Sequence, residues 1–259
     1  YYRAMATLPF KDTRLIDREE LARRWALAAE PCPDDISGPR WQLLLRELLW
    51  PLEPLRRLVG RPLEIAPAAN PKTVMLLPGF GAHPIRMRWM ARKLERAGHT
   101  AKKWGLGYNL GATEKSFAKV ERRLVDIYRR SGEPIHLVGW SLGGVMAREL
   151  AKAHPDKVAK VVTMGSPFSG SPRANNGWRA YQAIAGHRVD EPEIDAVVHE
   201  KPPVETVAMW SPRDGVVRPR AACGKPGERD RARALRCSHM GFVLTHEAVE
   251  AVLSELDRG

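Results

Sequence analysis

Ser141 occupies a position where a nucleophilic serine could act. It stands in HLVGWSLGGVMARELAKAHP (136–155), which begins as an apolar strand pattern and continues as a helix pattern. Gly139 and Gly143 lie two residues before and two residues after it, so strand and helix can approach closely at a tight turn. A serine hydroxyl becomes a nucleophile when a base takes its proton and N–H donors hold the oxyanion that forms. The pattern therefore predicts a nucleophile, and the alternative is a glycine-rich turn that only packs tightly.

Among the histidines that follow Ser141, His239 is the best placed to be its base. When the serine lies at a strand-to-helix turn of this kind, an acid and then a histidine follow it along the chain. His239, in CSHMGF, falls on the loop before the final predicted helix, next to a turn that Gly241 permits. A histidine with a structural role is the alternative. The other four lie on a surface turn, in an irregular segment or inside the final predicted helix: His154, His187, His199 and His246.

Asp214 is the candidate acid, because it follows a predicted strand at 204–210 and precedes His239. Its carboxylate would accept the second ring N–H of His239, which fixes the tautomer and stabilises the imidazolium. Asp-Gly is also a common turn signal, so a turn without a catalytic role is the alternative. Three other aspartates lie in an irregular insert or in a charged stretch: Asp190, Asp195 and Asp230.

The stretch LLPGFGAH (76–83) ends the first predicted strand and is the candidate oxyanion loop. Gly79 permits a close approach of the backbone, and the N–H groups of Phe80 and Leu142 would be the two donors. A backbone donor does not depend on its side chain, so an apolar residue at position 80 suits this role. A tight turn without a function is the alternative.

The elements that must position these residues alternate between strands and helices from Lys72 onward. A polar, proline-containing segment at 168–202 interrupts the alternation, with one helix expected around 176–185. Alternation of this kind predicts an α/β fold, a mostly parallel sheet with helices on both faces. We expect strands at 73–77, 99–104, 134–139, 157–166 and 204–210, and helices at 85–97, 112–130, 142–153 and 245–256.

Five motifs occur in a fixed order, namely LLPGFGAH, GWSLGG, MGSPFSG, SPRDGVV and CSHMGF. With them, the chain from about Thr73 to its C-terminus resembles an α/β-hydrolase of the lipase and esterase kind. The resemblance implies a serine carboxylic-ester hydrolase that forms an acyl-enzyme on a small-molecule ester and needs no cofactor. Pro78-Gly79 stands where many lipases have His-Gly, which weakens the assignment to triacylglycerol lipases. The resemblance implies that Ser141 is the nucleophile, His239 the base and Asp214 the acid. It also implies that Phe80 and Leu142 form the oxyanion hole.

Two other functions stay open at this point. The same catalytic residues could serve an acyltransferase or a thioesterase, in which an alcohol takes the acyl group or a thioester donates it. A non-catalytic protein that binds a membrane surface could also be built on a hydrolase fold.

Residues 1–70 differ from the rest of the chain, and 71–259 form the expected catalytic domain. The first part has helical patterns at 17–30 and 38–50, so we expect an N-terminal helical extension that packs on the core. We expect its apolar stripe to dock on the core, while an interfacial helix contacting a membrane through 38–58 is the alternative. The stripe consists of Trp41, Leu44, Leu45, Leu48 and Leu49. The insert at 168–202 is expected to form a small cap. Its Trp178, Tyr181 and Ile184 could face an apolar substrate chain, although packing on the core is the more common role of such a stripe.

Composition excludes several other classes. With 259 residues, 44% of them hydrophobic, the chain can bury a sizeable core. Its net charge is +12, and residues 71–135 hold 14 Lys and Arg against 5 Asp and Glu. We interpret this excess as a solvated basic face, with attraction to an anionic membrane or substrate as the alternative. No dense basic run interleaves with aromatic residues, so we expect no nucleic-acid partner.

The sequence also bears on location, metals and disulfides. No apolar run reaches the roughly 18–20 residues of a membrane span, and YYRAMATLPFKDTRL lacks the apolar core of a signal peptide, so we expect a cytoplasmic protein. No CxxC pair or His, Asp and Glu cluster has zinc spacing, so no metal is expected. Cys223 and Cys237 flank one loop and could pair, or they could stay free thiols like Cys32.

Overall fold

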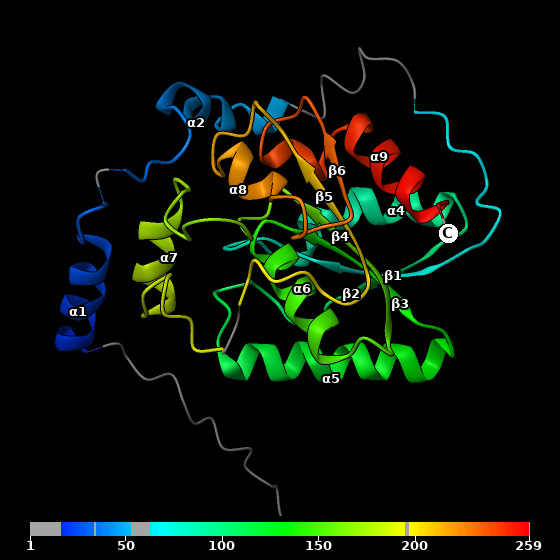
Figure 1. The fold of residues 1–259 in the computed structure, drawn as a ribbon, viewed down its shortest axis with the longest axis horizontal. Coiled ribbons are helices and arrows are strands. Elements are labelled where there is room, and N and C mark those ends of the chain that lie inside the picture. The colour runs from blue at the N-terminus through cyan, green and yellow to red at the C-terminus, as the bar shows by residue number, and fades with distance from the viewer. Residues whose placement is uncertain (1–16, 34, 53–62, 195–196, 259) are drawn as a thin grey trace, which may run out of the picture.

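The core of the protein is a six-stranded sheet with every neighbouring pair of strands parallel, in the order β2-β1-β3-β4-β5-β6 (Figure 1). The structure, a computed structural model, describes residues 17–33, 35–52, 63–194 and 197–258. Asp195 and residues 53–58 of the expected membrane-contacting stretch lie outside the described residues. The strands are β1 (Thr73–Leu77), β2 (Thr100–Lys103), β3 (Ile135–Trp140), β4 (Val158–Met164), β5 (Glu205–Trp210) and β6 (Arg231–Ala234).

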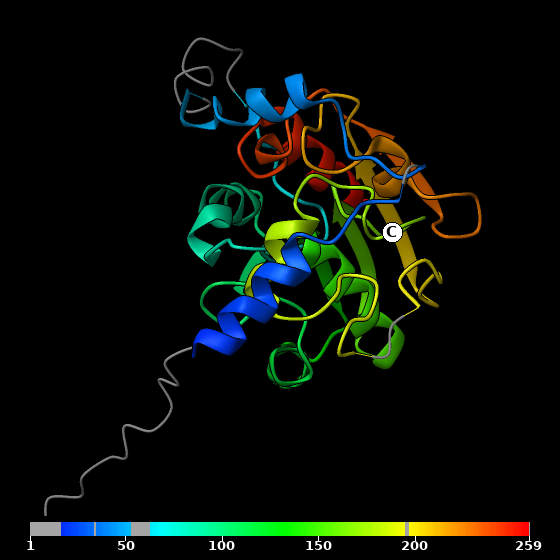
Figure 2. The ribbon, with the colours of Figure 1, turned by 90° about the vertical axis from the view of Figure 1, so that its left-hand side faces the viewer.

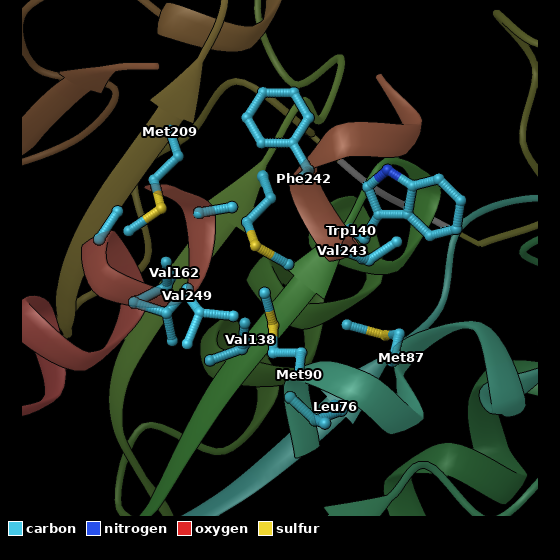
Figure 3. Packing of buried hydrophobic residues seen from close by; sticks show 14 of the residues in the cluster. Leu76, Met87, Met90, Val138, Trp140, Val162, Met209, Phe242, Val243 and Val249 are labelled. Atoms are coloured by element: carbon cyan, nitrogen blue, oxygen red, sulfur yellow. The ribbon is translucent and has the colours of Figure 1, made fainter. Parts of the chain in front are cut away.

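Helices cover both faces of this sheet, as the sequence predicts. Side chains alternate along a strand, so neighbouring residues of β1 belong to different cores. Val74 packs with side chains of α4 (Arg88–Arg96) and α9 (His246–Leu256), as Figure 3 shows for the residues around Met90 and Val249. Met75 packs on the opposite face with side chains of α5 (Glu114–Ser131) and α6 (Leu142–Ala153). The α/β fold class is therefore confirmed.

Helix α5 shows how local sequence sets the bounds of these elements. Thr113 caps its N-terminus, because its hydroxyl accepts a hydrogen bond from the Ser116 N–H while the Ser116 hydroxyl bonds the Thr113 N–H. Gly132 ends the helix in the left-handed conformation with φ 72°. The side chains that face the sheet are spaced for one helical face, at Val120, Leu124 and Ile127.

Two elements at the C-terminal side were not predicted, namely α8 (Pro219–Cys223) and strand β6. Strand β6 has the sequence RARA and lies at the edge of the sheet. The guanidinium of Arg231 lies 2.7 Å from the Glu255 carboxylate and also pairs with Glu205. Backbone pairing with β5 and these ion pairs, rather than an apolar run, hold this strand, and no hydrophobic pattern indicated it. The described residues also form three short 3₁₀ helices: η1 (Trp50–Leu52), η2 (Pro84–Met87) and η3 (Met240–Val243).

The first described helix, α1 (Arg18–Ala28), lies along α7 (Trp178–Ala185), a helix of the insert (Figures 1 and 2). Polar groups make the contact. The Arg24 guanidinium donates to the carbonyl of Ile184 at 2.6 Å, and the Gln182 amide donates to the carbonyl of Leu27 at 2.5 Å. The Glu30 carboxylate, just after α1, bridges Arg173 and Arg188 at 2.6 and 2.7 Å.

The prediction that the apolar stripe of α2 (Trp41–Glu47) docks on the core is wrong. The stripe faces solvent, with Trp41, Leu45 and Leu48 exposed by 65%, 52% and 71%. Glu47 is buried instead and is 6% exposed. A carboxylate that finds hydrogen-bond donors on the core can hold a short helix in place, and the leucines of the opposite face are then left outside. No described helix is long and apolar enough to cross a membrane.

Candidate active site

Ser141 forms the corner between β3 and α6 in a strained backbone conformation. Its φ is 54° and its ψ is −125°, and among the described residues it is the one non-glycine residue with positive φ. A Cβ on Gly139 would lie 2.4 Å from the Gly143 carbonyl oxygen, and one on Gly143 would lie 2.2 Å from that of Leu77. The corner therefore has no room for larger residues at either glycine. Strain of this kind persists where the surrounding structure holds a functional group in position.

The predicted oxyanion loop lies directly beside this corner. A Cβ built on Gly79 would be 3.0 Å from the Cβ of Ser141, so the loop and the serine are in contact. Within the described part of the chain, the backbone N–H groups of Phe80 and Leu142 donate no hydrogen bond. Both are therefore free to bind a ligand oxygen.

Asn109 fixes the shape of this loop. It is fully buried, and its side-chain amide donates to the carbonyl of Pro78 at 2.8 Å. Its backbone carbonyl accepts the N–H of Gly81 at 2.7 Å, and its own N–H donates to the carbonyl of Ala82 at 3.1 Å. One residue thus binds the loop on both sides of Phe80. The sequence analysis did not single out Asn109, because a lone asparagine in a loop carries no distinguishing pattern.

Asp214 and His239 form a buried pair. Oδ2 of Asp214 lies 2.8 Å from Nδ1 of His239, and the two residues are 1% and 4% exposed. Oδ1 of Asp214 accepts the N–H groups of Val216 and Val217, each at 2.8 Å, so both carboxylate oxygens are engaged. The indole N–H of Trp140, the neighbour of Ser141, donates to the His239 carbonyl at 3.1 Å. The histidine loop is thereby tied to the end of β3.

The electrostatic surroundings favour the protonated form of His239. Burial acts to lower the pKa of this imidazole, since it disfavours the charged ring. The charge of Asp214 and its hydrogen bond, together with the charge of Glu47, act in the opposite direction and prevail. The pKa of His239 is therefore raised above its ordinary value of 6.5. An imidazole of this kind can take a proton from a nearby hydroxyl and hold it during a reaction.

The carboxylate of Glu47 reaches the acid and base loops from the N-terminal segment. Its Oε1 accepts the backbone N–H of Gly215 at 2.9 Å and that of His239 at 2.7 Å, and its Oε2 accepts the N–H of Met240 at 3.1 Å. A Cβ on Gly215 would lie 2.4 Å from the carbonyl oxygen of Leu43, so the backbone of α2 also lies against the acid loop. The sequence analysis missed Glu47, because these partners lie 168 to 193 residues away along the chain.

A cavity of about 240 Å³ joins these parts and is lined by Phe80, Ser141, Leu142 and His239. Most of its other lining residues are apolar and come from the insert or from the loop after Asp214, among them Pro172, Trp178, Tyr181, Val189, Ile194 and Val217. The ring centroids of Tyr181 and Phe80 are 5.1 Å apart. Of the three insert residues considered for contact with a substrate chain, Trp178 and Tyr181 line the cavity. Ile184 does not line it and is 45% exposed, because it lies on the outer side of α7.

Four of the predicted site residues thus line one cavity, Asp214 is bonded to one of them, His239, and the alternative aspartates lie elsewhere. Asp190 pairs with Arg173 at 3.1 Å, and Asp230 accepts the N–H of Thr206 at 2.8 Å. All three cysteines are free thiols. Among the described residues, no three His, Cys, Asp or Glu side chains are grouped so as to hold a metal ion.

Known proteins resemble this chain in sequence. Residues 72–183 match the family model described as the alpha/beta hydrolase fold. The pimeloyl-[acyl-carrier protein] methyl ester esterase of Aliivibrio salmonicida is 29% identical over 114 residues, which are 42% of this chain. The aligned part spans 41% of the length of that curated relative.

Solved structures resemble this chain over a larger part of its length. The monoacylglycerol lipase of Paleococcus ferrophilus is 16% identical with a TM-score of 0.51, over 74% of this chain and 96% of that chain. The carboxylesterase CesB of Bacillus subtilis is 15% identical with a TM-score of 0.51, over 82% of this chain and 98% of that chain. At these identities the likeness concerns the fold, and the fold agrees with the family match.

Proposed function

We propose that this chain, which has the fold of the α/β-hydrolases, is a serine carboxylic-ester hydrolase with Ser141 as nucleophile. The observation that carries this proposal is that the strained serine, His239 and the residues with the two free backbone N–H groups border one cavity, while Asp214 is bonded to His239 behind it. These are the parts that acyl transfer through a serine requires. The esterase and lipase names among the similar proteins support the same reaction class.

In the proposed mechanism, Oγ of Ser141 attacks the carbonyl carbon of an ester while Nε2 of His239 takes the hydroxyl proton. The N–H groups of Phe80 and Leu142 stabilise the oxyanion, and Asp214 stabilises the imidazolium. His239 then gives its proton to the departing alcohol, which leaves an acyl group on Ser141. Water attacks this acyl-enzyme with His239 again as base, and the carboxylic acid and the free serine are released.

The cavity supports an ester with an apolar acyl or alcohol part. Its lining from the insert consists largely of proline, valine, isoleucine and aromatic side chains, which stabilise a chain through burial of apolar surface. No charged side chain other than His239 is among its lining residues, so the described cavity offers no counter-ion for a carboxylate or phosphate on the bound part.

A fluorophosphonate probe tests the nucleophile directly. We expect it to label the purified protein once, on the peptide that contains Ser141, and we expect p-nitrophenyl esters to be hydrolysed. A panel from C2 to C16 would give the chain length that the cavity accepts. Release from acyl-CoA, with and without an added alcohol, separates a hydrolase from a thioesterase or an acyltransferase. Labelling at another residue, or no labelling together with no ester hydrolysis, would reject the proposal.

A further inference from the structure

Helix α2 binds the acid loop and the base loop with one carboxylate. Glu47 accepts three backbone N–H groups, from the residue after Asp214, from His239 itself and from Met240. Hydrogen bonds to an ionised acceptor are stronger than neutral ones, and a buried acceptor is costly to leave unpaired. The relative position of the two loops therefore depends on Glu47, which lies outside the residues matched to the hydrolase family, 72–183.

We propose that Glu47 is a positioning residue that holds Asp214 and His239 in register and adds negative charge beside the imidazole. This inference rests on the proposed function, because it assigns Glu47 to the same site. No described cation forms an ion pair with Glu47. Its charge therefore adds to that of Asp214 when His239 becomes positive during the reaction. Glu47 touches the backbone of the loops and not the reacting atoms, so its effect reaches the substrate through His239.

The test compares Glu47→Gln with Glu20→Gln. Glutamine keeps the shape of Glu47, removes its charge and loses one of the two acceptor oxygens. We expect kcat to fall between about tenfold and a hundredfold, as misplaced catalytic groups do, with a smaller change in KM. We also expect the midpoint of the pH profile of kcat/KM to move to lower pH. Glu20 lies on α1, where its carboxylate pairs with Arg23 and Arg24, so its variant should leave both measurements unchanged.

Two further measurements keep this proposal falsifiable. Glu47→Asp keeps the charge but shortens the side chain, so kcat should fall while the pH midpoint stays near that of the wild type. If Glu47→Gln does not fold, the fall in kcat of Glu47→Asp tests the proposal instead. The titration of His239 followed by NMR in wild type and Glu47→Gln needs no turnover, so it still decides the role of Glu47 if the protein hydrolyses no ester. An unchanged kcat and an unchanged His239 midpoint in Glu47→Gln would overturn the proposal.

The outer side of α2 and of the turn and 3₁₀ helix η1 that follow it carries a second, independent inference. Trp41 and five leucines form an exposed apolar surface, here called the α2 surface, with exposed fractions between 40% and 71%. Beside it, a groove between α2 and α8 is lined by four arginines and by no acidic residue. Among the described residues, none of these arginines has an ion-pair partner. The leucines are Leu44, Leu45, Leu48, Leu49 and Leu52, and the arginines are Arg40, Arg46, Arg218 and Arg220.

We infer that the α2 surface docks on an anionic lipid bilayer. A short helix with one strongly apolar face and adjacent arginines is typical of a segment that lies in the headgroup region. The unpaired arginines match the negative potential of anionic lipids, and Trp41 suits the boundary between acyl chains and headgroups. The net charge of +12 acts in the same direction.

Sedimentation with vesicles tests this inference. We expect the wild type to sediment with phosphatidylcholine vesicles that contain phosphatidylglycerol, less with phosphatidylcholine alone, and less as salt is raised. The double variant Leu45→Asp, Leu48→Asp should remain in the supernatant and melt like the wild type. Ile184→Asp changes an exposed apolar residue on α7 and should sediment normally. A wild type that does not sediment, or a double variant that still does, would reject the inference. Dimers in solution that only the double variant abolishes would assign the surface to a second copy instead.

Discussion

Helices α5 and α2 both carry an apolar face, which is buried on α5 and exposed to solvent on α2. On α5, Leu124 is completely buried against the sheet. On α2, Leu45 and Leu48 face solvent, and the buried side chain is Glu47. Helix α5 has 18 residues and belongs to a layer of the α/β fold, while α2 has seven and lies over the loops at the active site.

The difference shows that hydrophobic periodicity identifies the buried face only where a helix covers a large apolar surface. Apolar burial is non-directional and grows with area, so it orients a long helix on a sheet. The loops under α2 instead offer backbone N–H groups at Gly215, His239 and Met240. A carboxylate satisfies these donors and leucine does not. The helix therefore points the Glu47 carboxylate toward the loops, and the N–H donors of the loops determine its orientation.

The largest expected effect is a loss of activity from a substitution at Ser141, in the α/β core. Ser141→Ala should lower kcat for ester hydrolysis by about 10⁶, since the nucleophile is lost and only binding and oxyanion stabilisation remain. Alanine is no larger than serine, so the melting temperature should stay near that of the wild type. Ser131→Ala, at the end of α5, is the control and should keep full activity. Turnover that survives in a pure Ser141→Ala preparation would mean that another group carries the chemistry.

The next effect concerns the acid. Asp214→Asn should lower kcat by about 10⁴ without unfolding the protein, because asparagine favours the wrong tautomer of His239. Activity assays and thermal melts on the same preparation measure both expectations. Asp190→Asn breaks a pair with Arg173 on the insert and should have a much smaller effect. If Asp190→Asn were the more damaging change, the assignment of the acid to Asp214 would be wrong.

Leucine substitutions on α5 and on α2 should have very different effects on the free energy of unfolding. Leu124→Ala should lower the free energy of unfolding by about 2–5 kcal/mol, the range for a buried leucine that leaves a cavity. Leu45→Ala should change it by no more than about 0.5 kcal/mol, because the side chain is exposed. Urea unfolding of the two variants beside the wild type measures both. Equal losses would show that the leucines of α2 are buried in solution, and the contrast between the two helices would then disappear.

The same contrast explains how much of the molecule the sequence predicts. Strands β1, β3, β4 and β5 are short apolar runs between turns, and each lies where the alternation places it. The corner at Ser141 was predictable because its glycines are required locally, within two residues of the serine. Strand β6 was not, because arginines held by ion pairs produce no hydrophobic pattern.

In the candidate site, too, some residues could be predicted from the sequence and others could not. The groups with proposed chemistry could be named from motif order, and all of them except Asp214, which is bonded to His239, line one cavity. The residues that hold them could not be named, since Asn109, Trp140 and Glu47 act through bonds to backbone groups far away in the sequence. A backbone N–H or carbonyl is present at nearly every residue, so its partner leaves no trace in the sequence.

The smallest effect predicted here is a shift in pH dependence. Asp214 and Glu47 outweigh the effect of burial and raise the pKa of His239 above 6.5. The base acts as the neutral imidazole, so kcat/KM should rise about tenfold per pH unit on the acid side and reach half of its maximum above pH 6.5. Initial rates with p-nitrophenyl acetate between pH 5 and 9, corrected for spontaneous hydrolysis, give this midpoint.

Stability should change in the opposite direction over the same pH window. A group whose pKa is higher in the folded than in the unfolded protein stabilises the fold in its protonated form. The contribution of His239 is thus complete below pH 6.5, where the unfolded histidine is also protonated, and is lost as pH rises through the folded pKa. Activity should therefore increase where this part of the stability declines. Asp214→Asn removes the carboxylate that raises the pKa of His239 the most, so it should move the His239 midpoint observed by NMR to lower pH. A wild-type midpoint below 6.5 by both activity and NMR would show that burial outweighs the two carboxylates, and that α2 contributes less to the electrostatics of the site than its contacts indicate.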